Sequence, residues 1–239
     1  MRAYRTAIFI ACVIILVLGC KKRSNERSID VNYNPVIDPA DFVATVDNQY
    51  FPLIPGTTFH YENTTEEGIE LDTVTVTHDT KVILGVTCVV VHDVVTLGRL
   101  TVEDTLDWYA QDTDGNVWYF GEDTQKLEDG GISTEGSWEA GVDGAKPGIV
   151  IQGNPQIGAP YRQEYLFNVA EDMAQVIGVG ETVTVPYGTF PNCIKTKDWS
   201  AIEPDVVENK YFCPGIGQLL AETVQGGTER EVLVSITPP

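Results

Sequence analysis

The alternation of apolar and polar residues is clearest between positions 100 and 110. Even-numbered positions there are mostly apolar, whereas the odd-numbered positions 99 to 107 carry Arg, Thr, Glu and Asp. A period of two is typical of a β-strand with one buried and one solvated face. We therefore predict an antiparallel strand whose apolar face, with Leu106 and Trp108, points into the core.

Similar patterns recur along the chain, with Gly-, Asp- and Pro-containing turns between them. Residues 169–177 fit either a helical face or the extension of a strand. Residues 121–160 are dense in Gly and Pro, and we predict a long, ordered, acidic loop region there because Trp138 needs burial. Further strands are expected over 58–62, 69–78, 86–96, 117–120, 161–167, 182–185, 193–198, 206–212, 217–224 and 230–236.

A weak internal repeat supports this map. In each half a Gly is followed by a Cys-containing strand, an aromatic strand, a second Gly and another strand. The two copies begin at Gly85 and Gly188, and their aromatic strands contain 108–110 and 211–213. Either an internal duplication or a chance likeness between hairpins explains the pattern. Both predict an all-β protein, a strongly curved antiparallel sheet forming an open or half barrel over residues 42–239.

The amino-terminal segment predicts export. Arg2 and Arg5 precede an apolar run over residues 7–18, which is too short to span a membrane comfortably. The run ends in Val-Leu-Gly-Cys at Cys20, which resembles the lipobox of bacterial lipoproteins. That resemblance implies a signal peptide over 1–19 and lipidation of Cys20 by acyl chains such as palmitate. An ordinary signal peptide or a short anchor is the alternative.

The residues after Cys20 bear on location. Residues 20–41 are expected to form a lipidated tether to the membrane, because their first part is polar and aperiodic. Lys21 follows the cysteine where an Asp would favour the inner membrane, so we expect the cell envelope, and the outer membrane in a Gram-negative host. The 239 residues have a formal charge of −20, which excludes nucleic acid as a favoured partner.

The cysteines suggest one cross-link. A hairpin turning near Glu203 would place Cys193 opposite Cys213, and export favours disulfides. The alternative is that Cys193, Cys213 and Cys88 are buried apolar side chains. Cys88 is assigned to the core in either case.

One His–Asp pair is a candidate for chemistry. The predicted hairpin around residue 99 brings His92 near Asp104, which shares the parity of the apolar face. Facing the interior, such a pair would have perturbed pKa values and could act in acid–base catalysis. A structural hydrogen bond is the favoured alternative, and the chain contains neither Gly-x-Ser-x-Gly nor His-Glu-x-x-His.

Two acidic segments suggest further candidates. Asp112, Asp114 and Asn116 have the alternate spacing of a calcium loop, but Val117 replaces the expected Gly, so a simple turn is the default. No other cofactor is expected. In the long loop region, Glu135 and Glu139 flank Trp138, an arrangement suited to sugar stacking and glycosidic acid–base chemistry.

The chain also resembles a known group of proteins. The similarity covers about residues 50–225 and is to a family of uncharacterised bacterial secreted proteins and lipoproteins, which implies no known activity. Residues 51–56 and the repeated pattern are more loosely similar to curved half-barrel lipoproteins of the lipid-carrier type. The runs that carry the family resemblance are 103–112, 116–122, 135–141, 144–149, 161–165 and 170–174.

Three hypotheses of function follow. The first is an envelope-anchored, non-enzymatic module that binds a hydrophobic or glycan ligand or associates with the envelope. The second is a carbohydrate-active enzyme that uses Glu135, Glu139 or Asp104. The third is a structural domain stabilised by calcium at Asp112, Asp114 and Asn116.

Overall fold

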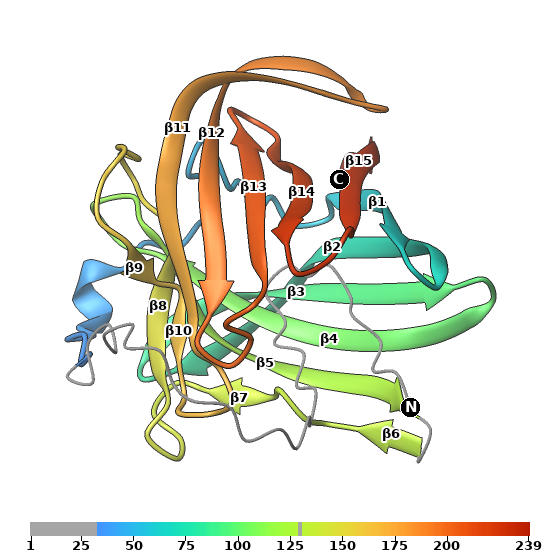
Figure 1. Ribbon diagram of the computed structural model, residues 1–239. Helices are drawn as coiled ribbons and strands as arrows, with labels where there is room; N and C mark the ends of the chain where they lie inside the picture. The colour runs from blue at the N-terminus through green and yellow to red at the C-terminus, as the bar shows by residue number, and fades with distance from the viewer. Residues whose placement is uncertain (1–32, 129–130) are drawn as a thin grey trace.

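A computed structural model describes residues 33–128 and 131–239, so the predicted signal peptide and Cys20 lie outside the described residues. The described chain forms one fifteen-stranded antiparallel sheet (Figure 1). Its elements are η1(Pro39–Asp41), β1(Thr58–Thr65), β2(Gly68–Ile83), β3(Val86–Leu97), β4(Leu100–Gln111), β5(Val117–Glu128), β6(Gly131–Ser133), β7(Trp138–Glu139), β8(Lys146–Ile151), β9(Tyr161–Arg162), β10(Glu164–Tyr165), β11(Asp172–Val185), β12(Gly188–Ser200), β13(Val207–Cys213), β14(Gly217–Gln225) and β15(Arg230–Thr237).

The sheet is nearly closed into a barrel. Thirteen strands follow the order β10-β8-β5-β4-β3-β2-β1-β15-β14-β13-β12-β11-β9, and β6 and β7 pair with β5. The two ends of this path, β9 and β10, are separated in the chain only by Gln163. Since β9 pairs with β11 and β10 pairs with β8, one short segment changes partner at Gln163. The predicted curved all-β antiparallel sheet is confirmed, and its one seam lies at this residue.

The strands follow the predicted map closely outside one region. Residues 169–177, which the sequence left open, enter the strand β11 at Asp172. The predicted loop region over 121–160 is wrong in part, because β5 continues to Glu128 and β6, β7 and β8 also lie in it. The glycines there serve close strand contacts as well as loops. Gly121 has φ +133°, and a Cβ at this position would overlap the carbonyl oxygen of Trp138 in β7.

Residues 33–41, expected to belong to the tether, lie against the barrel. The Tyr33 hydroxyl donates to the carbonyl oxygen of Pro147 at 2.8 Å. Phe42 packs edge-on against Trp118 and Phe120, with ring centroids 6.3 and 5.6 Å away. Aromatic side chains therefore fix this segment, and the described chain contacts the barrel from Tyr33 onward. None of the described helices is long and apolar enough to cross a membrane.

One end of the barrel is filled by aromatic and aliphatic side chains. Tyr109 stacks on Tyr119 with centroids 4.9 Å apart, and Phe51 meets Tyr109 edge-on at 5.4 Å. The long β11–β12 hairpin arches over this part of the molecule in Figure 1. At its tip the Tyr187 amide donates to the Leu233 carbonyl at 3.2 Å, and Val185 is buried beneath it. This end is therefore closed by the protein itself.

Closure at the seam depends on Gly148. It is buried in β8, and a Cβ there would overlap the backbone of Gln163 and the carbonyl of Arg162. We predict that Gly148→Ala forces the strands apart and lowers the free energy of unfolding by about 1–3 kcal/mol. Chemical denaturation monitored by tryptophan fluorescence measures the change.

Gly158→Ala is the matched control, since a Cβ there meets its nearest atom only at 3.5 Å. It should change stability by no more than about 0.5 kcal/mol. Equal effects of the two substitutions would show that the seam is not closed by this contact.

Candidate functional site

The strand β4 presents its charged side chains to the barrel interior. Glu103, Thr105 and Asp107 are buried, whereas Asp104 and Leu106 on the opposite face are exposed. The prediction that the apolar parity of this strand points inward is therefore wrong at Leu106, although Val102, Trp108 and Ala110 of the same parity are buried. The reason lies in its partners, since in the register the inward face of β4 lies opposite polar residues of β5, namely Lys126, Thr124 and Glu122, and opposite Asp93 of β3.

Eight carboxyl groups face one another across this interior, and we call them the acidic interior. They come from six strands, and each residue is at most 5% exposed. Cross-strand register places their side chains on the same face as the aromatic core. The members are Glu70, Asp72, Asp93, Glu103, Asp107, Glu122, Asp198 and Glu231.

Asp72 joins two other members of the acidic interior. Its carboxyl group interacts electrostatically with those of Asp93 and Glu231, and within the described chain neither of its oxygens has a hydrogen-bond partner, so its charged form is unfavourable. Burial, reinforced by the neighbouring acids, raises the pKa of Asp72 and of Glu231 well above their usual values. Burial likewise raises the pKa of Asp93 to about 7. Proton binding by this trio therefore persists to higher pH than it does for carboxyl groups in water.

A second group surrounds Tyr119. Asp107 and Glu122 face each other across β4 and β5, and the Tyr119 hydroxyl donates to Asp107 Oδ1 at 2.6 Å. Within the described chain, Asp107 Oδ2 and Glu122 Oε2 have no hydrogen-bond partner. Burial, followed by mutual repulsion, raises the pKa of Asp107. Burial raises that of Glu122 as well, although Lys126 opposes the shift.

Two lysines compensate part of this charge. Lys126 Nζ lies 3.7 Å from Glu103 Oε2, and Lys210 Nζ lies 3.9 Å from Asp198 Oδ2. Burial raises the pKa of Asp198 to about 6 even though Lys210 stabilises its charged form. For Lys210, burial lowers the pKa, but the surrounding carboxylates outweigh burial and the net pKa is raised.

The acidic interior is thus a set of proton-binding groups in a filled core. With two lysines beside eight acids, electrical neutrality requires that several carboxyl groups stay protonated. Among residues 33–128 and 131–239, no three His, Cys, Asp or Glu side chains are arranged as metal ligands. The chemistry that this arrangement supports is the uptake and release of protons.

The predicted His92–Asp104 pair forms, but not where the sequence placed it. His92 Nε2 lies 2.8 Å from Asp104 Oδ1 on the outer face of the sheet, with side chains 40% and 53% exposed. The expected position facing the interior is therefore wrong, because β3 and β4 turn these residues outward. The pair remains a solvated surface contact.

The Asp112 turn is held by its own hydrogen bonds. Asp112 Oδ1 accepts from the amides of Asp114 and Asn116, and Oδ2 accepts from the Asn116 side chain and the Trp118 indole. Asn116 Oδ1 accepts from the Gly153 amide at 2.9 Å. These oxygens stabilise the β4–β5 turn, which is the default reading of the calcium-like spacing.

The predicted sugar-stacking residues do not form an open platform. Trp138 is buried against Tyr119, with centroids 5.3 Å apart. Glu139 forms an ion pair with Lys81 at 2.7 Å, and Glu135 is exposed. The expectation that Trp138 offers a ring face to a ligand is wrong, because the residue is needed to cover the barrel core beside β5.

The cysteines separate into two kinds. Cys193 and Cys213 are joined by a disulfide, with Cα atoms 4.1 Å apart at the end of the β12–β13 ladder. Cys88 is a buried thiol in the core, and burial raises its pKa to about 12. A thiolate is therefore not present there at neutral pH.

Comparison with known proteins finds solved structures that are similar to this chain. No protein-family model and no curated protein matches the chain. It is similar to a protein of Bacteroides fragilis NCTC 9343, provisionally described as exported and as having a YmcC-like fold. The identity is 15%, the match covers 80% of this chain and 100% of that chain, and the TM-score is 0.47.

A second solved structure is similar to the same extent. It is from Parabacteroides distasonis ATCC 8503 and is provisionally described as a lipoprotein. The identity is 13%, the match covers 80% of this chain and 99% of that chain, and the TM-score is 0.46. The predicted resemblance to bacterial exported proteins and lipoproteins is confirmed as a similarity of structure, and neither description names an activity.

The acidic interior predicts an unusual pH dependence of stability. The folded pKa values of these carboxyl groups lie above their unfolded values, so the folded chain binds more protons than the unfolded chain. Their favourable contribution is complete below about pH 4 and is lost as the pH rises through the folded values. We expect the free energy of unfolding to fall by about 2–4 kcal/mol between pH 5 and pH 8, measured by urea denaturation.

The variant Asp107→Asn/Glu122→Gln tests the source of this effect. It removes two buried titrating groups while keeping side-chain shape, and it should raise stability at pH 8 more than at pH 5. Asp123→Asn/Glu128→Gln, from exposed positions of β5, is the control and should keep the wild-type slope. A flat wild-type profile, or equal slopes in both double variants, would contradict the assignment.

Proposed function

We propose that this chain is a lipid-anchored, non-enzymatic protein of the bacterial cell envelope that serves as a folded platform at the membrane surface. The Val-Leu-Gly-Cys sequence at Cys20, which follows a charged segment and an apolar run of secretory length, supports this localisation. Acyl chains on one cysteine hold a folded domain at a bilayer. The Cys193–Cys213 disulfide supports the same localisation, because disulfides persist in oxidising compartments.

The filled interior favours a platform over a lipid carrier. A carrier needs a concave apolar face that is open to an acyl chain. Here the inward faces of β2 to β5 carry the acidic interior, and the aromatic end is closed by Phe51, Tyr109 and Tyr119. An alkyl chain placed among these carboxyl groups would gain little and would separate them from their hydrogen-bond donors, such as Tyr119 for Asp107 and Asn63 for Glu70. This filling of the barrel is the observation that carries the proposal.

The candidate groups for catalysis favour a non-enzymatic role. His92 and Asp104 form a solvated contact on an outer face, where nothing excludes water or fixes a substrate. Trp138 is buried and Glu139 is paired with Lys81, so the segment proposed for glycoside chemistry serves packing. We therefore expect the outer surface of the barrel to make the contacts with other envelope components.

The lipid anchor is tested by substitution of Cys20. In a bacterial host that processes lipoproteins, the wild-type chain should appear in the membrane fraction with an acylated Cys20 at its amino terminus. Cys20→Ala should accumulate as the unprocessed precursor, because the modified thiol is absent. Intact-protein mass spectrometry of both fractions measures processing and acylation together.

Cys12→Ala is the matched control, since it removes a cysteine from the same leader and should be processed normally. An unmodified Cys20 in the wild-type protein would overturn the anchor. Reduced Cys193 and Cys213 in protein taken from the host would argue against export.

The platform proposal also predicts that the barrel holds no bound ligand. Native mass spectrometry of the mature protein, taken from its own host, should give the mass of the chain and its acyl anchor alone. A stoichiometric additional lipid would show that the barrel opens to a hydrophobic ligand, and the platform proposal would fail. A cytosolic protein of similar acidity, purified through the same detergent, controls for nonspecific lipid adhesion.

A further inference from the structure

Four apolar side chains are exposed on the side of the barrel where the amino-terminal segment docks. We call them the tether-side face: Val36, Val82, Leu84 and Val142. Their exposed fractions are 89%, 65%, 47% and 49%. They come from three parts of the fold, namely the amino-terminal segment, the end of β2 with the β2–β3 turn, and the β7–β8 connection. Exposed apolar residues gathered from several elements indicate a contact surface more strongly than single ones do.

Close packing of glycines joins these elements. A Cβ on Gly141 would lie 2.6 Å from Leu84 Cδ2, so Leu84 rests directly on the connection that carries Val142. A Cβ on Gly85 would lie 2.9 Å from Pro39 Cγ, which brings the amino-terminal segment onto the same turn. Figure 1 shows this segment and the β2–β3 turn on the same side of the barrel. The four residues are therefore parts of one surface region.

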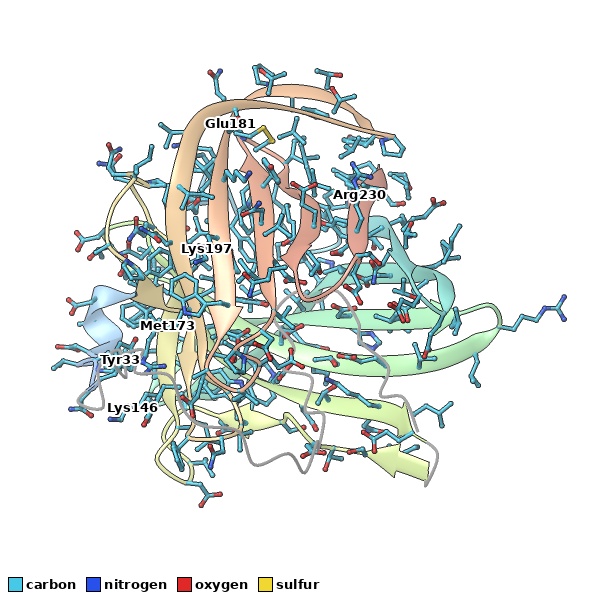
Figure 2. All side chains as sticks on the ribbon, viewed as in Figure 1. Tyr33, Lys146, Met173, Glu181, Lys197 and Arg230 are labelled. Carbon is cyan, nitrogen blue, oxygen red and sulfur yellow. A yellow bond between two sulfur atoms is a disulfide. The ribbon has the colours of Figure 1, made fainter. Side chains whose placement is uncertain are left out.

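The first described residue, Tyr33, is held at a fixed point beside this face. The Tyr33 hydroxyl donates a hydrogen bond to the Pro147 carbonyl oxygen, and the Tyr33 carbonyl oxygen accepts one from the Lys146 ammonium. The Arg162 guanidinium lies 5.9 Å from the Tyr33 ring and 4.6 Å from the Tyr165 ring. Figure 2 shows Tyr33 and Lys146 close together at this edge of the barrel. Whatever precedes Tyr33 must therefore start from here.

The distance from the anchor limits which face can reach the bilayer. Thirteen peptide links separate Cys20 from Tyr33, and they span at most about 45 Å when fully extended. The far hairpins of the barrel lie a full strand away, since the twelve residues of β3 or β4 extend about 40 Å. When the residues between Cys20 and Tyr33 span less than this maximum, the tether-side face is the part of the barrel that meets the membrane first.

We propose that the tether-side face rests on the lipid bilayer, with Val36, Val82, Leu84 and Val142 inserted among the lipid headgroups. This inference rests on the proposed lipid anchor at Cys20, which keeps the bilayer within reach. Lys81 and Lys146 border the face, where Lys81 pairs with Glu139 and Lys146 donates to the Tyr33 carbonyl oxygen, so the contact with lipid rests on the four apolar side chains. Each apolar contact is weak alone, and the anchor makes it effective by raising the local concentration of lipid.

Site-directed fluorescence tests this orientation in the full lipidated protein. Single variants Val82→Cys and Val142→Cys are labelled with an environment-sensitive dye and reconstituted in phosphatidylethanolamine–phosphatidylglycerol vesicles. Cys88 is buried and the other two described cysteines form the disulfide, so the dye reacts at the new thiol. We expect at least a twofold rise in emission on reconstitution and quenching by lipids that carry a nitroxide near the headgroup.

Leu100→Cys and Ile132→Cys are matched controls from the far hairpins, with exposed fractions of 54% and 69% in the wild-type protein. Their emission should stay unchanged and resist the quencher. If mass spectrometry shows the protein to be acylated and the dye responds equally at the tether-side positions and at the control positions, the proposed orientation alone is overturned. Absence of the acyl modification would instead overturn the anchor on which it rests. Circular dichroism of each labelled variant confirms that the sheet is intact.

Discussion

The cost of removing carboxylates from water governs this structure. An isolated charge in a protein interior is so unfavourable that the group takes up a proton or finds an opposite charge. The barrel uses both solutions. Asp198 lies beside Lys210, while burial, reinforced by Asp93 and Glu231, raises the pKa of Asp72 and favours its protonated form. The interior is therefore neutral by proton binding as much as by ion pairing.

This constraint also explains how tightly the barrel must close. Water entering beside Asp107 or Glu122 would lower the cost of ionising them, and charged neighbours would then repel each other. The seam at Gln163 is the place where the ladder is interrupted, and there the backbones of β8 and of the β9–β10 segment touch through Gly148. Tyr33 and Arg162 cover the same seam from outside. Closure of the sheet and neutrality of its interior thus support each other.

Much of the fold could be predicted from the sequence because strand formation depends on local alternation and turn residues. The pairing of Cys193 with Cys213 and the contact of His92 with Asp104 followed from counting along hairpins. The face of β4 could not be predicted this way. Alternation shows that two faces differ, but which face is inside depends on the partners in the sheet, and these are set by contacts distant in sequence.

Particular residues show where the missing signal lay. In β2, Glu70 and Asp72 alternate with Ile69 and Leu71 in the same sense as the acidic and apolar residues of β4. Only the register of β2, β3 and β4 reveals that these acidic faces coincide. Similarly, Gly121 and Gly148 suggested loops because glycine is common in turns, whereas here each allows two backbones to touch.

The two halves of the barrel are stabilised by different physical means. Six of the eight members of the acidic interior belong to β2, β3, β4 and β5, where burial raises the pKa of Asp72, Asp93 and Asp107. In β12 and β13, Asp198 has a lysine partner and the Cys193–Cys213 disulfide ties the strands covalently. A rise in pH acts on both halves, because burial also raises the pKa of Asp198 to about 6, whereas the disulfide is independent of protonation. Because β1 and β15 join the halves by a continuous ladder and one apolar core contains residues of both, a loss of stability in the first half is transmitted to the second.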